Sequence, residues 1–338
     1  MVSFDPDAAA APDSGIFGLD CTPESARVVL VPVPFAATVS YGGGAERGPD
    51  AIWTASRQVD LYDLQYGRVY EHGICMLPAD PEVMRAHAQA RAAAQAVVDA
   101  GGAPPGDARC ASVDAAGALV NRSLRAAVAP LLDAEKTVGV IGGDHSVPFA
   151  AIEAAAERGD LGILHVDAHA DLRPAYEGFR WSHASIMHNV LAACPNVSRL
   201  VQVGVRDFGE GEFRAIHESE GRVLTHFDAQ WRQRLFTGAR YDDLVSEVID
   251  ALPERVWVSV DIDGLDPSLC PNTGTPVPGG LQFAELAHLL HRLAKSGRRM
   301  IGFDLVEVSP GEDDDNKWDG NVGARVLYKL CGAAMYSR

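Results

Sequence analysis

The sequence predicts an α/β protein with a three-layer α/β/α architecture and a mostly parallel central sheet. Two observations predict this fold. Apolar runs of strand length alternate with helix-favouring segments, and several of these runs end directly in acidic or histidine side chains. The chain has 338 residues, 47% of them hydrophobic, which is enough for the core of one domain. We therefore expect a single domain over residues 27–338, preceded by an N-terminal arm, residues 1–26, that could contact another subunit.

The predicted elements follow one another in a regular order. The first buried strand is expected at 26–34, and a glycine-rich segment at 40–49 follows it. That segment lacks the lysine and serine of a phosphate-binding loop, so we interpret it as a flexible loop at the mouth of a site. Helices are expected at 81–100, which is rich in alanine, and at 111–134. Later strands are expected within residues 136–146, 161–171, 199–206, 222–228, 256–267 and 298–308, and later helices at 281–295 and 321–331.

Three of the predicted strands end in side chains that can bind metal ions. The run that begins at Leu161 ends in Asp167, His169 and Asp171, and residues two apart on an extended backbone project to the same face. One strand would therefore offer three ligands to one point. Because the carboxyl ends of parallel strands meet at one edge of a sheet, the ligands of all three strands would gather there. These candidate ligands are His145, Asp167, His169, Asp171, Asp261 and Asp263.

Two divalent cations would explain so many acids in one place. Four carboxylates in close quarters raise one another's pKa, so a strong positive charge is needed to keep them ionised. A ligand set of carboxylates and imidazoles without thiolates is typical of Mn, Ni, Co or Fe rather than structural Zn, and we expect Mn or Ni. Two such ions can share a water molecule and lower its pKa toward neutrality, which predicts a metal-assisted hydrolysis.

Several motifs resemble the signatures of the ureohydrolase superfamily, in particular its agmatinase-like branch, which includes guanidine and biguanide hydrolases. The motifs are G-G-D-H-S at 142–146, D-A-H-A-D at 167–171, S-V-D-I-D-G-L-D-P at 259–267, T-G-T-P-V-P-G-G at 273–280 and E-V-S-P at 307–310. The resemblance runs from about Val28 to the C-terminus. It implies an arginase-like fold and a hydrolase that acts on C–N bonds of linear amidines, with residues 27–338 as the catalytic domain.

The resemblance also implies how the ligands are divided between the two metal ions. One ion would be held by His145, Asp167, Asp171 and Asp261, and the other by His169, Asp167, Asp261 and Asp263, so that Asp167 and Asp261 bridge them. In the family, a hydroxide that bridges the metals attacks the guanidinium carbon, and the products are urea and an amine or ammonia. His165 shares a predicted strand face with Asp167 and is the best candidate to support it.

The family assigns catalytic and binding roles to residues near these ligands. Asp171 would accept a proton from the attacking water. His183 would pass a proton to the departing nitrogen, which suits a side chain that titrates near neutrality. Glu307 would hold the planar guanidinium through paired hydrogen bonds, and the segment around Thr275 would help to orient it.

The loop 172–183 differs from the corresponding loop of arginase, which argues against arginine as the substrate. Two alternatives remain open. Arg173 or Arg180 would bind a carboxylate, as a guanidino acid or formimidoylglutamate requires. Alternatively, these arginines pair with Glu177 or with acids of another subunit, while aromatic side chains surround a small or alkylated cation. The candidate substrate contacts in this loop are Tyr176, Glu177, Arg180 and Trp181.

The overall charge favours a cationic substrate. The formal net charge is −17, which disfavours nucleic acid and anionic membrane surfaces as partners. The acidic run 312–319 could lie at the mouth of the site or at a subunit contact, or it could simply be solvated. We expect a cytoplasmic protein without a membrane span, because there is no apolar run of about 18 residues and no secretory leader. Six scattered cysteines without a C-x-x-C motif indicate reduced thiols.

The expected function is hydrolysis of a small guanidino compound, which is agmatine-like, guanidine itself or a biguanide of the metformin type. A guanidino acid or formimidoylglutamate is the alternative substrate. A different alternative is a non-catalytic partner subunit in a hetero-oligomeric ureohydrolase. The resemblance implies a trimer or hexamer, in which a paralogous subunit could take part.

Overall fold

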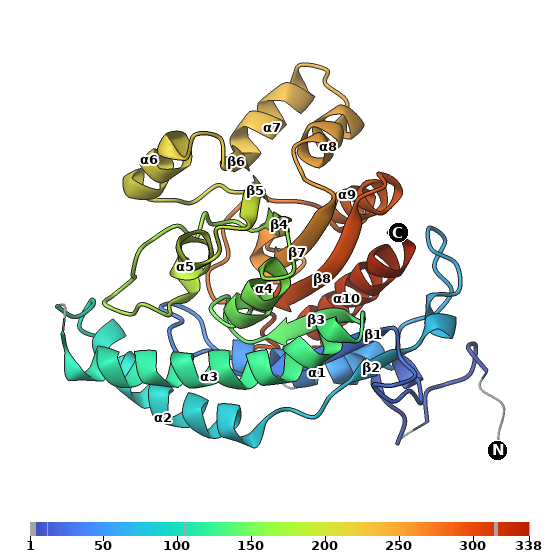
Figure 1. The fold of residues 1–338 in the computed structure, drawn as a ribbon, viewed down its shortest axis with the longest axis horizontal. Helices are drawn as coiled ribbons and strands as arrows, with labels where there is room; N and C mark the ends of the chain where they lie inside the picture. The colour runs from blue at the N-terminus through green and yellow to red at the C-terminus, as the bar shows by residue number, and fades with distance from the viewer. Residues whose placement is uncertain (1–4, 12, 105, 314–316, 338) are drawn as a thin grey trace.

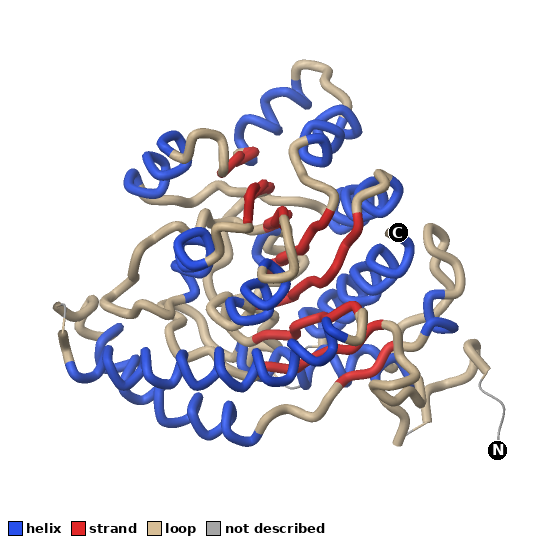
Figure 2. Tube along the Cα trace, viewed as in Figure 1, coloured by secondary structure: helices blue, strands red, loops and turns tan. Residues whose placement is uncertain are grey.

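The computed structural model describes residues 5–11, 13–104, 106–313 and 317–337. In this part of the chain, eight strands form one sheet in the order β2-β1-β3-β8-β7-β4-β5-β6, and every neighbouring pair is parallel (Figures 1 and 2). The predicted α/β fold is confirmed. The strands are β1 (Val28–Val33), β2 (Ile74–Met76), β3 (Thr137–Gly142), β4 (Leu161–Val166), β5 (Val197–Val203), β6 (Val223–His226), β7 (Arg255–Asp261) and β8 (Arg299–Val306).

Helices cover both faces of the sheet (Figure 1). They are α1 (Gly48–Ser56), α2 (Pro81–Val98), α3 (Ala108–Asp133), α4 (Phe149–Ala156), α5 (Ile186–Ala193), α6 (Glu210–Glu218), α7 (Asp228–Phe236), α8 (Tyr241–Asp250), α9 (Phe283–Lys295) and α10 (Trp318–Tyr336). Apolar residues of α1, α8, α9 and α10 form one core cluster with the sheet, and those of α2 to α6 form a second. The sheet is therefore the middle of three layers.

The strands read as continuous apolar runs because both of their faces are buried. In β4, Leu161 and Ile163 belong to the core cluster beneath α2 to α6, whereas Leu164 and Val166 belong to the other cluster. This division follows from the alternation of side chains along a strand. All six residues of β4 are buried, and His165 is the one polar side chain among them.

Four loops that carry chemistry meet at one edge of the sheet because of the strand order. β3, β8, β7 and β4 are adjacent, although β8 is the last strand in the sequence. Their carboxyl ends are followed by the segments that contain His145, Glu307, Asp263 and Asp167, respectively. Parallel strands place these segments side by side, which is the arrangement that the sequence predicts.

Part of the predicted N-terminal arm packs against its own chain. Ile16 and Phe17 are 1% and 2% exposed. The Phe17 ring lies 4.9 Å from the Tyr328 ring, and the Phe17 amide donates to Ser56 Oγ over 3.0 Å. The segment around Phe17 is therefore part of the core beside α1 and α10. Contact of the arm with another subunit stays a prediction.

The structure differs from the sequence prediction at several element boundaries. The glycine-rich segment does not stay irregular, because a 3-10 turn at Ala45–Arg47 leads into α1, which was not predicted and has Pro49 in its first turn. Its first half does reach the edge of the sheet at which the candidate ligands gather, where the Gly42 amide donates to the Gly274 carbonyl over 2.9 Å. The last helix is longer than predicted. The acidic run 312–319 falls partly outside the described residues.

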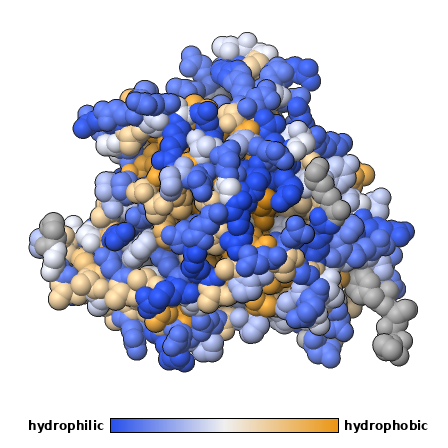
Figure 3. Space-filling model, viewed as in Figure 1, coloured by the Kyte–Doolittle hydropathy of each residue, from blue (hydrophilic) through white to orange (hydrophobic). Residues whose placement is uncertain are grey.

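The visible surface is mostly hydrophilic. In the face drawn in Figure 3, apolar residues occur in small separate areas between polar ones. Among the described residues, no helix combines the length and the apolar composition needed to cross a membrane.

Candidate active site

The ligand-bearing segment after β4 is a turn rather than a strand. β4 ends at Val166, and the His169 amide donates to Asp167 Oδ1 over 2.6 Å, which folds the backbone around the Asp167 side chain. Asp171 adopts a left-handed conformation with φ of 55°. The prediction of an extended backbone as far as Asp171 is therefore wrong. The three side chains still converge, because the turn replaces the strand as the element that aims them.

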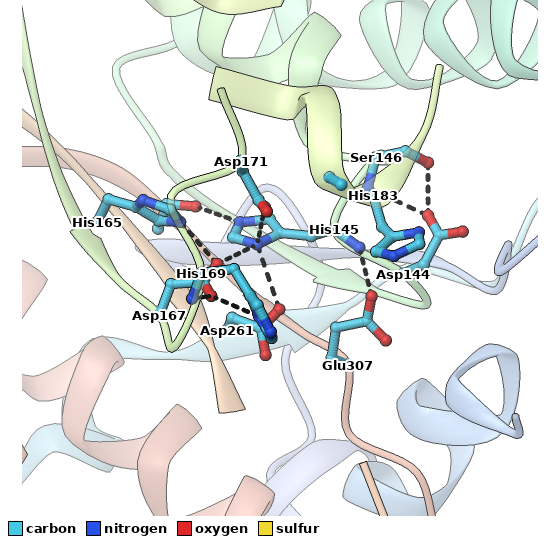
Figure 4. Close-up of polar contacts among 12 residues, drawn as sticks. Asp144, His145, Ser146, His165, Asp167, His169, Asp171, His183, Asp261 and Glu307 are labelled. Carbon is cyan, nitrogen blue, oxygen red and sulfur yellow. Dashed lines mark hydrogen bonds and ion pairs between the residues drawn. The ribbon is translucent and has the colours of Figure 1, made fainter. Parts of the chain in front are cut away.

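His145 lies at the centre of three carboxylates, as Figure 4 shows. Its Nδ1 atom is 2.9 Å from Asp167 Oδ2 and 3.3 Å from one carboxylate oxygen each of Asp171 and Asp261. The four side chains come from the ends of β3, β4 and β7, and all of them are buried.

A second group of donors lies beside the first. His169 Nδ1 is 3.1 Å from Asp263 Oδ2 and 3.4 Å from Asp167 Oδ1. Asp167 thus turns one carboxylate oxygen to His145 and the other to His169, and both groups of potential metal donors include it. Asp261 Oδ1 accepts from the Asp263 amide over 2.8 Å, which holds the two acids of this loop together. All six predicted ligands are therefore brought to one place.

The donor set fits a pair of divalent cations. Ligands bonded to one cation at about 2.0–2.2 Å lie roughly 3 Å from one another, which is the spacing around His145 and His169. Two of these carboxylates resist ionisation without such a charge. Burial and the charges of Asp263 and Asp167 raise the pKa of Asp261 well above its ordinary value. Burial and the charge of Asp167 raise the pKa of Asp171 to about 6. Positive charge between these oxygens would stabilise their ionised form and so lower both pKa values again.

A buried hydrogen-bond chain fixes which nitrogen of His145 faces the carboxylates. Asp304 accepts from Trp257 Nε1 over 2.6 Å and from Ser259 Oγ over 2.8 Å. Since the single serine proton goes to Asp304, His145 Nε2 must donate to Ser259 Oγ, 2.9 Å away. Nδ1 is thereby the nitrogen that faces the three carboxylates, and a cation bound there would take the place of its proton. Trp257, Ser259 and Asp261 lie two residues apart along β7, so their side chains project to the same face.

His165 supports Asp167, as predicted. Its Nε2 atom lies 2.8 Å from Asp167 Oδ2, and Gln202 Nε2 donates to its Nδ1 atom over 2.9 Å. Because Nδ1 accepts, Nε2 must carry the proton that His165 donates to Asp167. The Gln202 carbonyl in turn accepts from the Thr225 hydroxyl over 2.7 Å. This chain reaches the site from β5 and β6.

His183 is oriented by a hydroxyl group from the loop that joins β1 to the glycine-rich segment. Thr38 Oγ1 accepts from the His183 amide over 3.1 Å, and it lies 3.3 Å from Asp144 Oδ2 and 3.2 Å from His183 Nδ1. The threonine proton goes to the carboxylate, so Nδ1 donates to the hydroxyl and Nε2 is left as an acceptor. Burial lowers the pKa of His183 to about 4, which keeps the ring neutral near pH 7.

Glu307 has one occupied and one vacant carboxylate oxygen. Oε1 accepts from the His145 amide over 3.0 Å, whereas Oε2 is buried without a hydrogen-bond partner among the described residues. Burial and the charge of Asp144 raise the pKa of Glu307 well above its ordinary value. Thr273 Oγ1 donates to the Glu307 carbonyl over 2.9 Å, and Thr275 Oγ1 lies 3.3 Å from Asp263 Oδ2. A buried acid with a free oxygen is suited to a cation.

A cavity of about 280 Å³ opens in front of the donor groups. Its lining contains five of the predicted site residues, His169, Asp171, Tyr176, His183 and Thr275, together with two acids that sequence reasoning missed, Asp207 and Glu212. The lining consists of Ser40, Tyr41, His169, Asp171, Arg173, Tyr176, His183, Ala184, Asp207, Glu212, Thr275, Pro276 and Val277. Asp167 and Asp263 lie 3.4 Å and 3.1 Å from Nδ1 of the lining residue His169. The cavity is therefore predominantly acidic.

Only part of the loop 172–183 reaches this cavity. Glu177, Arg180 and Trp181 are not among its described lining residues. Tyr176 and Phe179 exchange two backbone hydrogen bonds across a tight turn, which turns Glu177 toward the backbone of Ala103. Arg180 lies over the face of the Trp181 ring. These three residues therefore do not line this cavity, and their contact with a substrate stays a prediction.

Trp181 packs against the helical layer rather than against the cavity. Its ring lies 4.8 Å from the Phe149 ring, and a Cβ atom at Gly117 would come within 2.8 Å of Trp181 Cβ. Arg173 does line the cavity, but it pairs with Glu212 over 3.3 Å and its guanidinium lies over the Tyr176 ring. Neither predicted arrangement of the loop is reproduced in full: Tyr176 faces the cavity, and the arginines do not pair with Glu177.

Comparison with known proteins identifies the family of this chain. The sequence profile of the arginase family matches residues 26–332. The chain belongs to the arginase family. Family relatives include N(1)-aminopropylagmatine ureohydrolase from Thermus thermophilus, which is 36% identical over 297 residues, or 87% of each chain. Proclavaminate amidinohydrolase from Streptomyces clavuligerus is 32% identical over 321 residues, or 93% of this chain and 91% of the relative.

Solved structures of the arginase family share the fold. Proclavaminate amidinohydrolase from Streptomyces clavuligerus superposes with a TM-score of 0.76 at 23% identity, over 98% of this chain and 100% of the other. Agmatine ureohydrolase from Thermoplasma volcanium gives a TM-score of 0.71 at 24% identity, over 99% and 96%. The predicted resemblance to the agmatinase-like branch is confirmed, and so is the predicted enzyme class, a hydrolase that acts on C–N bonds of linear amidines.

Proposed function

We propose that this arginase-family chain hydrolyses a C–N bond of a small cationic guanidino compound and releases urea and an amine or ammonia. The observation that carries the proposal is the pair of donor groups that share Asp167 behind an acidic cavity. Two relatives are named as a ureohydrolase and an amidinohydrolase, which supports the same reaction class for this chain.

Two divalent cations are part of the proposal. His145, Asp167, Asp171 and Asp261 would hold one, and His169, Asp167, Asp261 and Asp263 would hold the other. When bound, the cations supply the charge that lets a shared water molecule ionise near neutral pH. A set of carboxylates and imidazoles favours Mn or Ni over structural Zn.

The chain's own residues have separate tasks in the proposed reaction. The vacant Oε2 atom of Glu307 accepts a hydrogen bond from the guanidinium and neutralises its charge. Asp171 takes a proton from the attacking water. His183 is neutral, so its bare Nε2 atom first accepts a proton and then passes it to the departing nitrogen, and the proton lost by the water leaves with the amine. The C–N bond breaks, so that guanidinium and water become urea and an ammonium ion. Thr275 completes the wall beside the guanidinium.

An agmatine-like substrate fits the cavity best. Asp207 lines the cavity and forms no ion pair within the described chain, so it can receive the amine at the far end of such a substrate. Glu212 is committed to Arg173 and to two backbone amides. A guanidino acid is the second candidate, because Arg173 lines the cavity and would have to leave Glu212 to bind a carboxylate.

A urea-release assay tests the proposal. The purified chain, loaded with Mn or with Ni, is incubated with agmatine, guanidine, metformin, 4-guanidinobutyrate and formimidoylglutamate. Urea is measured for the guanidines, formamide for formimidoylglutamate, and guanylurea and dimethylamine in addition to urea for metformin. We expect the highest kcat/KM for agmatine or a longer guanidino amine, and an Asp207→Asn variant should raise KM for these amines but not for guanidine. No turnover of any compound with two metals bound would instead indicate a non-catalytic subunit of a mixed oligomer.

A trimer or hexamer and a cytoplasmic location are further parts of the proposal. The chain's family membership supports an oligomer, and light scattering of the purified protein tests it. A mass equal to one 36.0 kDa chain would contradict this expectation.

A further inference from the structure

The amino edge of the sheet, opposite the metal ligands, carries a row of basic residues. Four adjacent strands, β1, β3, β8 and β7, each begin at or directly after a cationic side chain. These side chains are Arg27, Lys136, Arg299 and Arg255. The sequence order of the four residues does not reveal this row. It exists because β8 is inserted between β3 and β7.

The row lines a pocket of about 570 Å³, which we call the amino-edge pocket. Arg158, which follows α4, is a fifth cation in its lining, and Glu135 is the single acid among the lining residues that the structure describes. The lining is formed by Arg27, Leu132, Glu135, Lys136, Thr137, Arg158, Arg255, Arg299, Met300, Ile301, Ala334 and Ser337. Such an excess of positive charge is unexpected in a chain with a net charge of −17.

Part of this charge has a structural explanation. Lys136 donates to the Glu24 and Ala26 carbonyls, each over 2.7 Å. Arg158 binds Asp133 and the carbonyl of Ala154, and Arg255 donates to the carbonyls of Ala155 and Asp160. Several of these carbonyls lie at helix carboxyl ends, where cations are favourable. These three side chains therefore have structural partners.

Two of the arginines are not explained in this way. Arg27 Nε is buried and has no hydrogen-bond partner within the described chain. The exposed Arg299 side chain forms no hydrogen bond or ion pair among the described residues, although it lies directly across from Arg255 in the register of β7 and β8. Like charges at paired positions of neighbouring strands are destabilising. Consistent with this, burial and the charge of Arg299 lower the pKa of Arg255.

We propose that the amino-edge pocket binds a small, multiply charged oxyanion, such as a phosphate group. Guanidinium groups bind phosphate oxygens through pairs of short, charge-assisted hydrogen bonds, and Arg27 Nε and the Arg299 guanidinium are available to donate them. The anion would offset the repulsion between Arg255 and Arg299. The pocket lies a strand length, roughly 20 Å, from the metal ligands, so its occupant does not compete with the substrate.

Thermal unfolding of the full chain in increasing inorganic phosphate, at constant ionic strength, tests the proposal. In the wild type we expect a saturable rise of the unfolding midpoint. Arg299→Gln should have a higher midpoint than the wild type without phosphate, because the repulsion is relieved. It should also bind phosphate about tenfold more weakly. The two effects have opposite signs, which a purely structural arginine would not produce.

Arg214→Gln is the matched control, since Arg214 is an exposed arginine on α6 far from the pocket in the fold. It should respond to phosphate as the wild type does. Equal responses in all three proteins would identify an adventitious ion only and overturn the proposal. No saturable response in the wild type, or a lower midpoint for Arg299→Gln with unchanged phosphate dependence, would overturn it as well. Isothermal titration with phosphate gives the same comparison without unfolding.

Discussion

At the scale of single residues, one hydroxyl group links the loop after β1 to the proposed proton carrier, His183. Thr38 has only one proton to donate, and Asp144 receives it, so the threonine oxygen can accept from both the amide and Nδ1 of His183. Without that acceptor, the ring could rotate or carry its proton on the other nitrogen. We therefore treat Thr38 as a positioning residue.

Thr38→Val should lower kcat by about tenfold to a hundredfold with little change in KM, since valine keeps the shape but removes the hydrogen bonds. Histidine ¹⁵N spectra should show a loss of the Nδ1–H form of His183, which a defect in packing alone would not cause. Thr38→Ser should restore both measurements. Equal kcat and equal spectra for Thr38→Val and the wild type would contradict the assignment.

Ser259→Ala should weaken metal binding by about 10- to 100-fold, because His145 Nε2 loses its acceptor and Nδ1 is no longer held as a bare ligand nitrogen. Competition with a chromogenic chelator measures the affinity independently of turnover. Ser268→Ala is the control, since Ser268 is exposed and contacts only Asp266 with its hydroxyl group. Unchanged metal affinity after Ser259→Ala would show that the hydrogen bonds from His145 through Ser259 to Asp304 do not help His145 to bind metal.

The meeting of the six candidate ligands could be predicted because each follows an apolar run, and parallel strands bring the ends of such runs to one edge of the sheet. Ser259 and Asp304 were missed although both interrupt apolar strands at inward-facing positions, which is a usable signal. Thr38 offers no such signal, since its partner His183 lies 145 residues away and nothing local marks the contact. Contacts between distant loops depend on the packing of the whole fold.

At the scale of elements, the loop 172–183 is attached to the helical layer from outside. The Arg180 and Trp181 amides both donate to Asp114 of α3, and Trp181 covers Gly117 of the same helix. The cavity-facing side of the loop, which includes Tyr176, is thus held by contacts that lie behind it. The strands were easier to predict than this loop, because burial on both faces gives an unbroken apolar run.

Gly117→Ala should destabilise the protein by about 1–3 kcal/mol, because the added Cβ atom overlaps Trp181 and the loop has to shift. Gly211→Ala should instead stabilise it by about 0.5–1 kcal/mol, since Gly211 also lies in a helix but has nothing within 4 Å of the added atom. Urea denaturation gives both values. If both substitutions change the free energy of unfolding in the same direction, helix propensity and not the contact with Trp181 determines the effect of Gly117→Ala.

At the scale of the whole molecule, burial of ionisable groups links stability to pH. The pKa of His183 is about 4 in the folded chain, against an ordinary value of about 6.5. The unfolded chain therefore binds a proton at a pH where the folded chain does not. The contribution of His183 to stability is complete above pH 6.5 and is lost as the pH falls toward 4.

His183→Asn should consequently flatten the dependence of unfolding free energy on pH between 6.5 and 4. Urea denaturation of both proteins, each freed of metal by a chelator, isolates this difference from the effects of the other acids. Curves that run parallel through this window would contradict the lowered pKa.

The position of β8 has a consequence for how the protein is made. β8 is the last strand to be synthesised, yet it lies in the middle of the sheet, where it joins the half that carries His145 to the half that carries Asp261. Until β8 has left the ribosome, the edges of β3 and β7 that pair with it have no partner strand, and the two halves of the sheet are not joined. Ion loading must therefore wait until translation is almost complete, and a prematurely terminated chain could not be rescued by added metal.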